Sequence, residues 1–101
     1  MARFDVYTFS GRSIPLVIDV QAELLSDFKT RVVVPLILES KAQQEVLARL
    51  KPVFEVNGKR YVMITTDIGT IRTNDLGSLV GTLKNHRHDI TAALDFLFQG
   101  F

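Results

Sequence analysis

Apolar and β-branched residues gather in short runs in the first part of the chain. FDVYTF (4–9) divides by alternation into two sets of side chains, the period of two expected of a strand with one solvated face. PLVIDVQ (15–21) and RVVVPLI (31–37) are rich in Val and Ile, and the second is apolar for so long that we expect burial on both faces. Because proline has no N–H to donate, Pro35 predicts a bulge or a strand end.

A hairpin is predicted in the middle of the chain. VFEV (53–56) and KRYVMITT (59–66) flank Asn57-Gly58. This dipeptide favours a type I′ turn, which needs φ > 0 at both central residues. GTIRTND (69–75) follows as a candidate short strand. Together with the earlier runs, these segments indicate a mainly β protein.

Helical spacing is found first in ESKAQQEVLARL (39–50). Ser40 and Gln43 have the spacing of a capping box, and Glu45 and Arg49 form a potential i,i+4 ion pair. The local pattern therefore predicts a helix, which a strand-rich tertiary structure could override.

A second helix is predicted over HRHDITAALDFLFQ (86–99). Asn85 is a good N-cap residue, Asp89 lies in the early turns, and Gly100 is expected to end the helix. One stripe is apolar and is expected to pack on the sheet, whereas three residues should lie off that face. The stripe is Ile90, Ala93, Leu94 and Leu97, and the other three are Asp95, Phe98 and Gln99.

The composition is that of an ordinary globular chain. Its 101 residues are 47% hydrophobic, enough for one domain spanning 1–101 with a single core. A net charge of +1, from 12 basic and 11 acidic side chains without a block of like charge, argues against direct nucleic-acid binding. The absence of cysteine fits a reducing cytoplasm, and no apolar run approaches the ~18–20 residues that span a bilayer.

Few residues point to catalysis. His86 and His88 are the only histidines, and on a helix they would point about 200° apart, so we expect no shared metal ion. No glycine-rich phosphate loop or nucleophile elbow is present, and we expect no cofactor. One constellation could in principle cleave RNA, although turn capping and surface ion pairing explain it more simply. It consists of Thr65, Thr66, Asp67, Arg72 and Asp75.

Apolar residues also occur where the chain is expected to be exposed. Leu24 and Leu25 follow a strand, and FLFQGF (96–101) ends the chain. Leu24, Leu25, Phe98 and Phe101 could close the bottom of a barrel as part of the core. If they are exposed instead, they mark a protein–protein surface.

Five segments carry a family resemblance: VYT (6–8), LVIDVQAELL (16–25), RVVVPL (31–36), MITTD (63–67) and HDITAALDFLFQG (88–100). In this order and spacing they resemble the CcdB family, the toxins of plasmid and chromosomal toxin–antitoxin modules. The resemblance implies a small SH3-like antiparallel β-barrel with a C-terminal helix, as in the MazF and Kid toxins, and a two-fold homodimer. The helix over 41–50 is not prominent in that fold.

The resemblance also implies an activity without catalysis. CcdB-like toxins bind the DNA-gate region of the gyrase A subunit and trap gyrase while its DNA is cleaved. Well-known members have tryptophan and isoleucine where this chain has Gln99 and Phe101. The positions expected to bind gyrase by resemblance are Ala22, Leu24, Leu25, Asp95, Phe98, Gln99, Gly100 and Phe101.

A CcdA-like antitoxin is the second partner that the resemblance implies. A flexible segment of it would fold onto the toxin, and 9–14 and 38–46 are candidate contact segments. Two alternatives remain open from the sequence. One is a MazF-like endoribonuclease toxin on the same fold, and the other is a non-toxic homologue that only binds the antitoxin.

Overall fold

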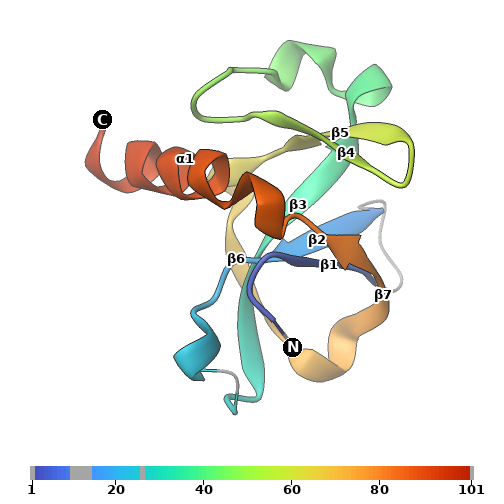
Figure 1. Ribbon diagram of the computed structural model, residues 1–101, viewed down its shortest axis with the longest axis vertical. Helices are drawn as coiled ribbons and strands as arrows, with labels where there is room; N and C mark the ends of the chain where they lie inside the picture. The colour runs from blue at the N-terminus through green and yellow to red at the C-terminus, as the bar shows by residue number, and fades with distance from the viewer. Residues whose placement is uncertain (1, 10–14, 26, 101) are drawn as a thin grey trace.

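One curled antiparallel sheet forms most of the structure. The computed structural model describes residues 2–9, 15–25 and 27–100. Within these residues seven strands and a C-terminal helix are present, and the sheet curls into a half-barrel with the helix across one side (Figure 1). The elements are β1 (Asp5–Phe9), β2 (Leu16–Asp19), β3 (Thr30–Leu38), β4 (Val53–Val56), β5 (Lys59–Met63), β6 (Gly69–Arg72), β7 (Leu76–Thr82) and α1 (Arg87–Gln99).

The strand order confirms a mainly β, barrel-like fold with a C-terminal helix. The sheet runs β4-β5-β3-β2-β1-β7, and β6 pairs with β3 beside β5. The long strand β3 thus pairs with β2 on one edge and with two shorter strands on the other.

The prediction of a bulge or strand end at Pro35 is wrong. Pro35 lies inside β3, in regular register opposite Val17. Its carbonyl accepts a hydrogen bond from the Ile64 N–H at 3.0 Å, and the N–H and C=O of one strand residue point to the same side. On that side the β6 pairing ends at Val33 and the β5 pairing starts at Leu36. The missing N–H therefore falls where β3 changes partner.

The predicted hairpin is confirmed. Asn57 and Gly58 have φ values of 51° and 82°, and Val56 pairs with Lys59 across the two-residue turn. The second strand ends at Met63, earlier than the predicted run over 59–66, because the chain turns into a short 3-10 segment at Thr65–Asp67.

Both faces of the central strands are covered. Val6, Ile18 and Val34 point into the main core, to which α1 contributes Ile90 and Ala93. The alternate residues of the same strands form a second cluster against residues of β6 and β7, so the predicted solvated face of 4–9 is wrong. The curl of the sheet brings β6 and β7 over that face. This second cluster comprises Tyr7, Val17 and Val33, with Phe9, Ile71 and Leu76 packed against it.

The helix predicted over 39–50 does not form. The segment contains two short 3-10 turns, Glu39–Lys41 and Gln43–Glu45, without side-chain caps. Between them Ala42 has an extended φ of −142° and is buried in a cluster beneath the segment. Glu45 pairs with Lys51 at 2.6 Å, not with Arg49. Burial of Ala42 against the sheet therefore overrides the local helical preference.

The C-terminal helix is confirmed with a shifted start. A 3-10 turn at Lys84–His86 precedes it, and His86, rather than Asn85, occupies the cap position, with no side-chain capping bond. Ile90 and Ala93 are fully buried as predicted. At the other end the left-handed Gly100 donates its N–H to the Phe96 carbonyl at 2.9 Å.

The sequence analysis missed strand β7. It contains two glycines and exposes several side chains, so it lacks the apolar pattern of a strand. Gly77 is needed because a Cβ at that position would overlap the Thr8 hydroxyl of the neighbouring β1. That hydroxyl instead accepts a hydrogen bond from the Ser78 N–H at 2.8 Å.

Candidate functional site

The β2–β3 connection presents apolar side chains to solvent. Ala22 and the short 3-10 turn Glu23–Leu25 are exposed, and Leu24 is 93% exposed. Leu25 is partly covered, at 38%. The alternative that Leu24 closes the bottom of the barrel is therefore wrong. An apolar side chain held so far out of the core is typical of a protein–protein surface.

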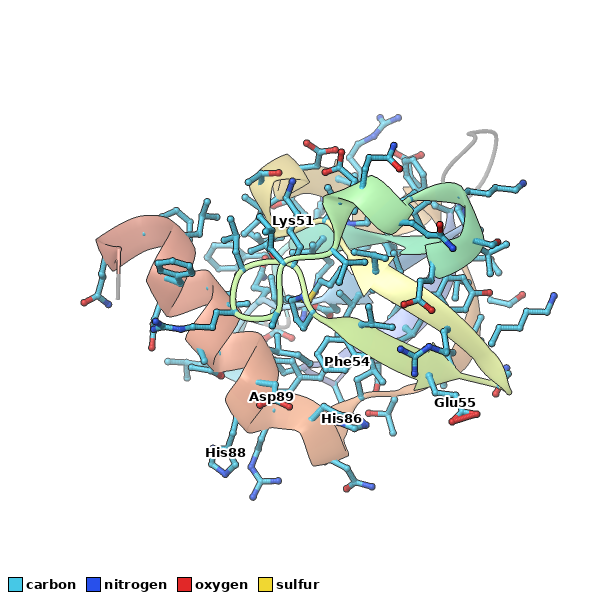
Figure 2. The ribbon with its side chains drawn as sticks, turned by 90° about the horizontal axis from the view of Figure 1, so that it is seen from above. Lys51, Phe54, Glu55, His86, His88 and Asp89 are labelled. Atoms are coloured by element: carbon cyan, nitrogen blue, oxygen red, sulfur yellow. The ribbon has the colours of Figure 1, made fainter. Side chains whose placement is uncertain are left out.

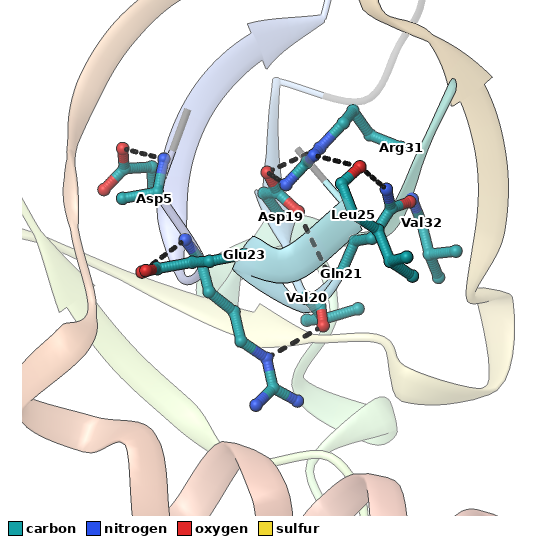
Figure 3. A network of polar contacts seen from close by, with 10 residues as sticks. Asp5, Asp19, Val20, Gln21, Glu23, Leu25, Arg31 and Val32 are labelled. Atoms are coloured by element: carbon teal, nitrogen blue, oxygen red, sulfur yellow. Dashed lines mark hydrogen bonds and ion pairs between the residues drawn. The ribbon is translucent and has the colours of Figure 1, made fainter. Parts of the chain in front are cut away.

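A buried polar network holds this turn (Figure 3). Asp19 and Arg31 are fully buried and form an ion pair in which Arg31 Nη2 lies 2.6 Å from Asp19 Oδ2. The Gln21 backbone N–H donates to Asp19 Oδ1, and the Gln21 Nε2 donates to the Leu25 carbonyl at 2.9 Å. The Gln21 Oε1 accepts from the Val32 N–H at 3.0 Å. The network thus fixes the backbone of the turn while its apolar side chains point outward.

The N-terminal residues add an outer brace to the same turn. The Arg3 backbone N–H lies 3.4 Å from Glu23 Oε1, and Arg3 Nε donates to the Val20 carbonyl at 3.0 Å (Figure 3). The guanidinium carbon sits 4.7 Å from the centre of the Phe4 ring. The turn is therefore held both by the buried network and by contacts from the N-terminal residues.

The end of α1 presents the second group of candidate residues. Asp95, Phe98, Gln99 and Gly100 are all exposed, and Phe98 is 70% exposed. They lie off the packed stripe, as the helical period predicts. Phe101 lies outside the described residues. An exposed aromatic at a helix end again favours contact with another protein over a role in the core.

A loop side chain supports the same part of the helix. The Arg49 guanidinium carbon lies 4.7 Å from the centre of the Phe96 ring, a geometry that favours cation–π attraction. Arg49, near the end of the segment that was predicted to be helical, therefore contacts α1 in its C-terminal half.

The fold does not join the two candidate segments into one patch within a single chain. In Figure 1 the β2–β3 turn and the C-terminal end of α1 lie at well-separated positions toward the same side of the molecule. A partner that contacts both must therefore be large, or must meet them on two copies of the chain.

Within the candidate ribonuclease constellation, Thr66 is exposed but Thr65 is not. Thr65 is fully buried, and its hydroxyl donates to the Leu50 carbonyl and lies 3.4 Å from the Met63 carbonyl. Arg72 forms an exposed ion pair with Asp75 at 3.6 Å. Thr65 is therefore committed to the fold and is unavailable as a nucleophile or proton donor.

The histidines do not converge on a metal site. His86 lies against Phe54, with ring centres 5.1 Å apart, and His88 extends away from it (Figure 2). In the part of the chain that the structure describes, no group of three or more His, Cys, Asp or Glu side chains could hold a metal ion. Nor does any helix there have the length and apolarity to cross a membrane.

The curled antiparallel sheet and its C-terminal helix define a small β-barrel-like protein. Its candidate contact residues are apolar side chains exposed on the braced turn and on the helix end. The family model described as CcdB protein matches residues 3–100. The chain therefore belongs to the CcdB family, as the sequence resemblance predicted. It is the toxin of a toxin–antitoxin system, from a family of gyrase poisons rather than enzymes in their own right.

Proposed function

We propose that this protein binds the DNA gyrase A subunit and traps gyrase in complex with cleaved DNA. The observation that carries the proposal is the exposure of Leu24 and Phe98, at 93% and 70%. Each lies in one of the two segments for which the family resemblance implies gyrase contacts. The whole chain, 1–101, acts in this proposal as one toxin domain.

The physical basis is selection of one gyrase conformation. A rigid body that fits only the open gate stabilises that state by its difference in affinity for open and closed gyrase. A two-fold homodimer would present both candidate segments twice and match the two-fold symmetry of the gyrase cavity. Gln99 lacks the large apolar ring of a tryptophan anchor, so Phe98 supplies the exposed ring at the helix end.

A CcdA-like antitoxin would neutralise the toxin. A hollow beside the segment 38–46 supports that part of the proposal, because it offers both apolar and charged groups to a folding peptide. Its lining includes Ile37, Lys41, Ala42, Glu45, Ile64 and Asp67. The other candidate segment, 9–14, lies outside the described residues apart from Phe9.

The test of poisoning is a cleavage assay with purified protein, the host's gyrase, supercoiled plasmid and ATP. We expect linear DNA after denaturation with the wild type and none with Gly100→Arg. A Cβ at Gly100 meets no atom within 4 Å, so the arginine side chain would extend outward and block docking. Gly100→Ala is the matched control, because it carries the same backbone strain at φ +81° without the bulk.

Absence of linear DNA with active host gyrase would refute poisoning and leave two alternatives. An endoribonuclease requires RNA cleavage that disappears with Arg72→Ala or Asp67→Ala. A non-toxic homologue requires antitoxin binding without growth arrest when the protein is expressed alone.

A further inference from the structure

The β2–β3 connection exposes an aromatic residue beyond the positions considered so far. Phe28 is 58% exposed and follows the Leu24–Leu25 turn along the same connection. Its neighbours Asp27 and Lys29 are exposed charged residues. An apolar ring with a charged rim has the composition of an interface centre.

The backbone on both sides of Phe28 is fixed. Its N–H donates to the Leu25 carbonyl at 3.1 Å, the same oxygen that accepts from Gln21 Nε2 at 2.9 Å and lies 3.5 Å from Arg31 Nη1. Phe28 is thereby tied to the buried network beneath the turn.

The residue after Phe28, Lys29, is held by hydrogen bonds to Thr73. The Lys29 carbonyl accepts hydrogen bonds from the Thr73 N–H at 2.9 Å and the Thr73 hydroxyl at 3.1 Å. Phe28 therefore stands between two anchored backbone positions. A ring displayed on a preordered backbone loses little conformational entropy on binding, which is the property of an effective anchor.

We propose that Phe28 is a further gyrase-contacting residue, an aromatic anchor that extends the Leu24–Leu25 surface. This inference rests on the proposed function. The occupant follows from continuity along the chain, because the Phe28 N–H is bonded to the carbonyl of Leu25, the residue that directly follows Leu24. In this proposal the gyrase surface that docks Leu24 extends along the connection to the exposed Phe28 ring.

The test compares three single variants for affinity to the purified host gyrase A subunit by calorimetry. Phe28→Ala should weaken binding about tenfold or more, as expected for loss of an aromatic hot spot. Leu24→Ala should weaken binding as well. Leu79→Ala is the matched control, since Leu79 is 61% exposed but lies on β7, on the other side of the molecule from the turn (Figure 1); we expect unchanged affinity.

The outcomes separate this inference from the proposed function. Wild-type affinity in Phe28→Ala, with Leu24→Ala weakened, overturns the role of Phe28 and leaves gyrase binding standing. No binding by the wild type overturns both. Each variant is also tested for mass in solution and for antitoxin binding. If Phe28→Ala instead loses self-association, or loses only antitoxin affinity, the ring serves that partner and the proposal is wrong.

Discussion

At the residue scale, two charged side chains are fully buried beneath an exposed turn. Asp19 and Arg31 compensate each other's charge through two hydrogen bonds to Asp19 Oδ2. Removing a charge from water is costly, and such a pair is tolerated only when its geometry and remaining hydrogen bonds are good. Here Asp19 Oδ1 accepts from the Gln21 N–H, and Arg31 Nη1 lies 3.5 Å from the Leu25 carbonyl. The pair therefore helps to hold the backbone that exposes Leu24 and Leu25.

Breaking this pair should be strongly destabilising. Arg31→Met leaves the Asp19 carboxylate buried without a partner and should lower the free energy of unfolding by about 3–5 kcal/mol, measured by urea denaturation. Asp19→Asn combined with Arg31→Met should recover part of the loss, because the uncompensated charge is gone. Arg60→Met is the control: its pair with Glu39 is exposed, and we expect little change. An equal loss in both single variants would contradict the special role of the buried pair.

Tyr7 should make stability fall at alkaline pH. Burial, with further contributions from Asp5 and Asp19, raises the pKa of its phenol above the usual value of 10.0. The unfolded chain then loses the phenol proton at lower pH than the folded one, so stability is full below pH 10 and declines as pH rises toward the folded pKa. Tyr7→Phe should remove this decline, which urea midpoints between pH 8 and 11 would measure. Parallel curves for both proteins would contradict it.

At the element scale, the sequence predicts secondary structure correctly where local residues restrict the backbone to one conformation. It fails where contacts with distant parts of the chain decide the conformation. Asn57-Gly58 specifies its hairpin because a type I′ turn requires φ > 0 at both central residues, and Asn and Gly adopt it readily. The segment 39–50 has helical spacing, yet burial of Ala42 breaks it into two turns. Strand β7 has no apolar alternation and forms because β1 pairs with it.

The hairpin turn should show its backbone requirement in stability. Gly58→Ala places a Cβ on a residue with φ +82° but in open space, so only backbone strain opposes it. We expect a loss of about 1–2 kcal/mol in urea denaturation. Gly81→Ala is the matched control, since its Cβ also meets nothing within 4 Å and its φ is not positive. Equal effects of the two substitutions would show that strain at Gly58 is not the cause.

At the scale of the whole molecule, the curl of the sheet buries both faces of its central strands, while two apolar segments stay outside. The exposed segments lie apart in one chain (Figure 1). A second copy would double them and cover further apolar surface. The homodimer that the family resemblance implies is consistent with this arrangement.

Dimerisation should be visible in solution and in stability. We expect a mass of about twice the 11.4 kDa of the chain by light scattering. The urea midpoint should rise with protein concentration, because association stabilises the folded state by mass action. A single-chain mass with a concentration-independent midpoint would contradict the homodimer.

The sequence by itself determined the mainly β class, the Asn57-Gly58 hairpin and the helix that ends at Gly100, because period, turn chemistry and a left-handed cap are local properties. It also indicated Leu24 and Phe98 as candidate contact residues. Only the tertiary structure decided that both side chains are exposed, that Tyr7 is buried on a second face, and that Asp19, Gln21 and Arg31 meet beneath the turn. These facts depend on the curl of the sheet and on contacts between residues distant in the chain, which no local pattern encodes.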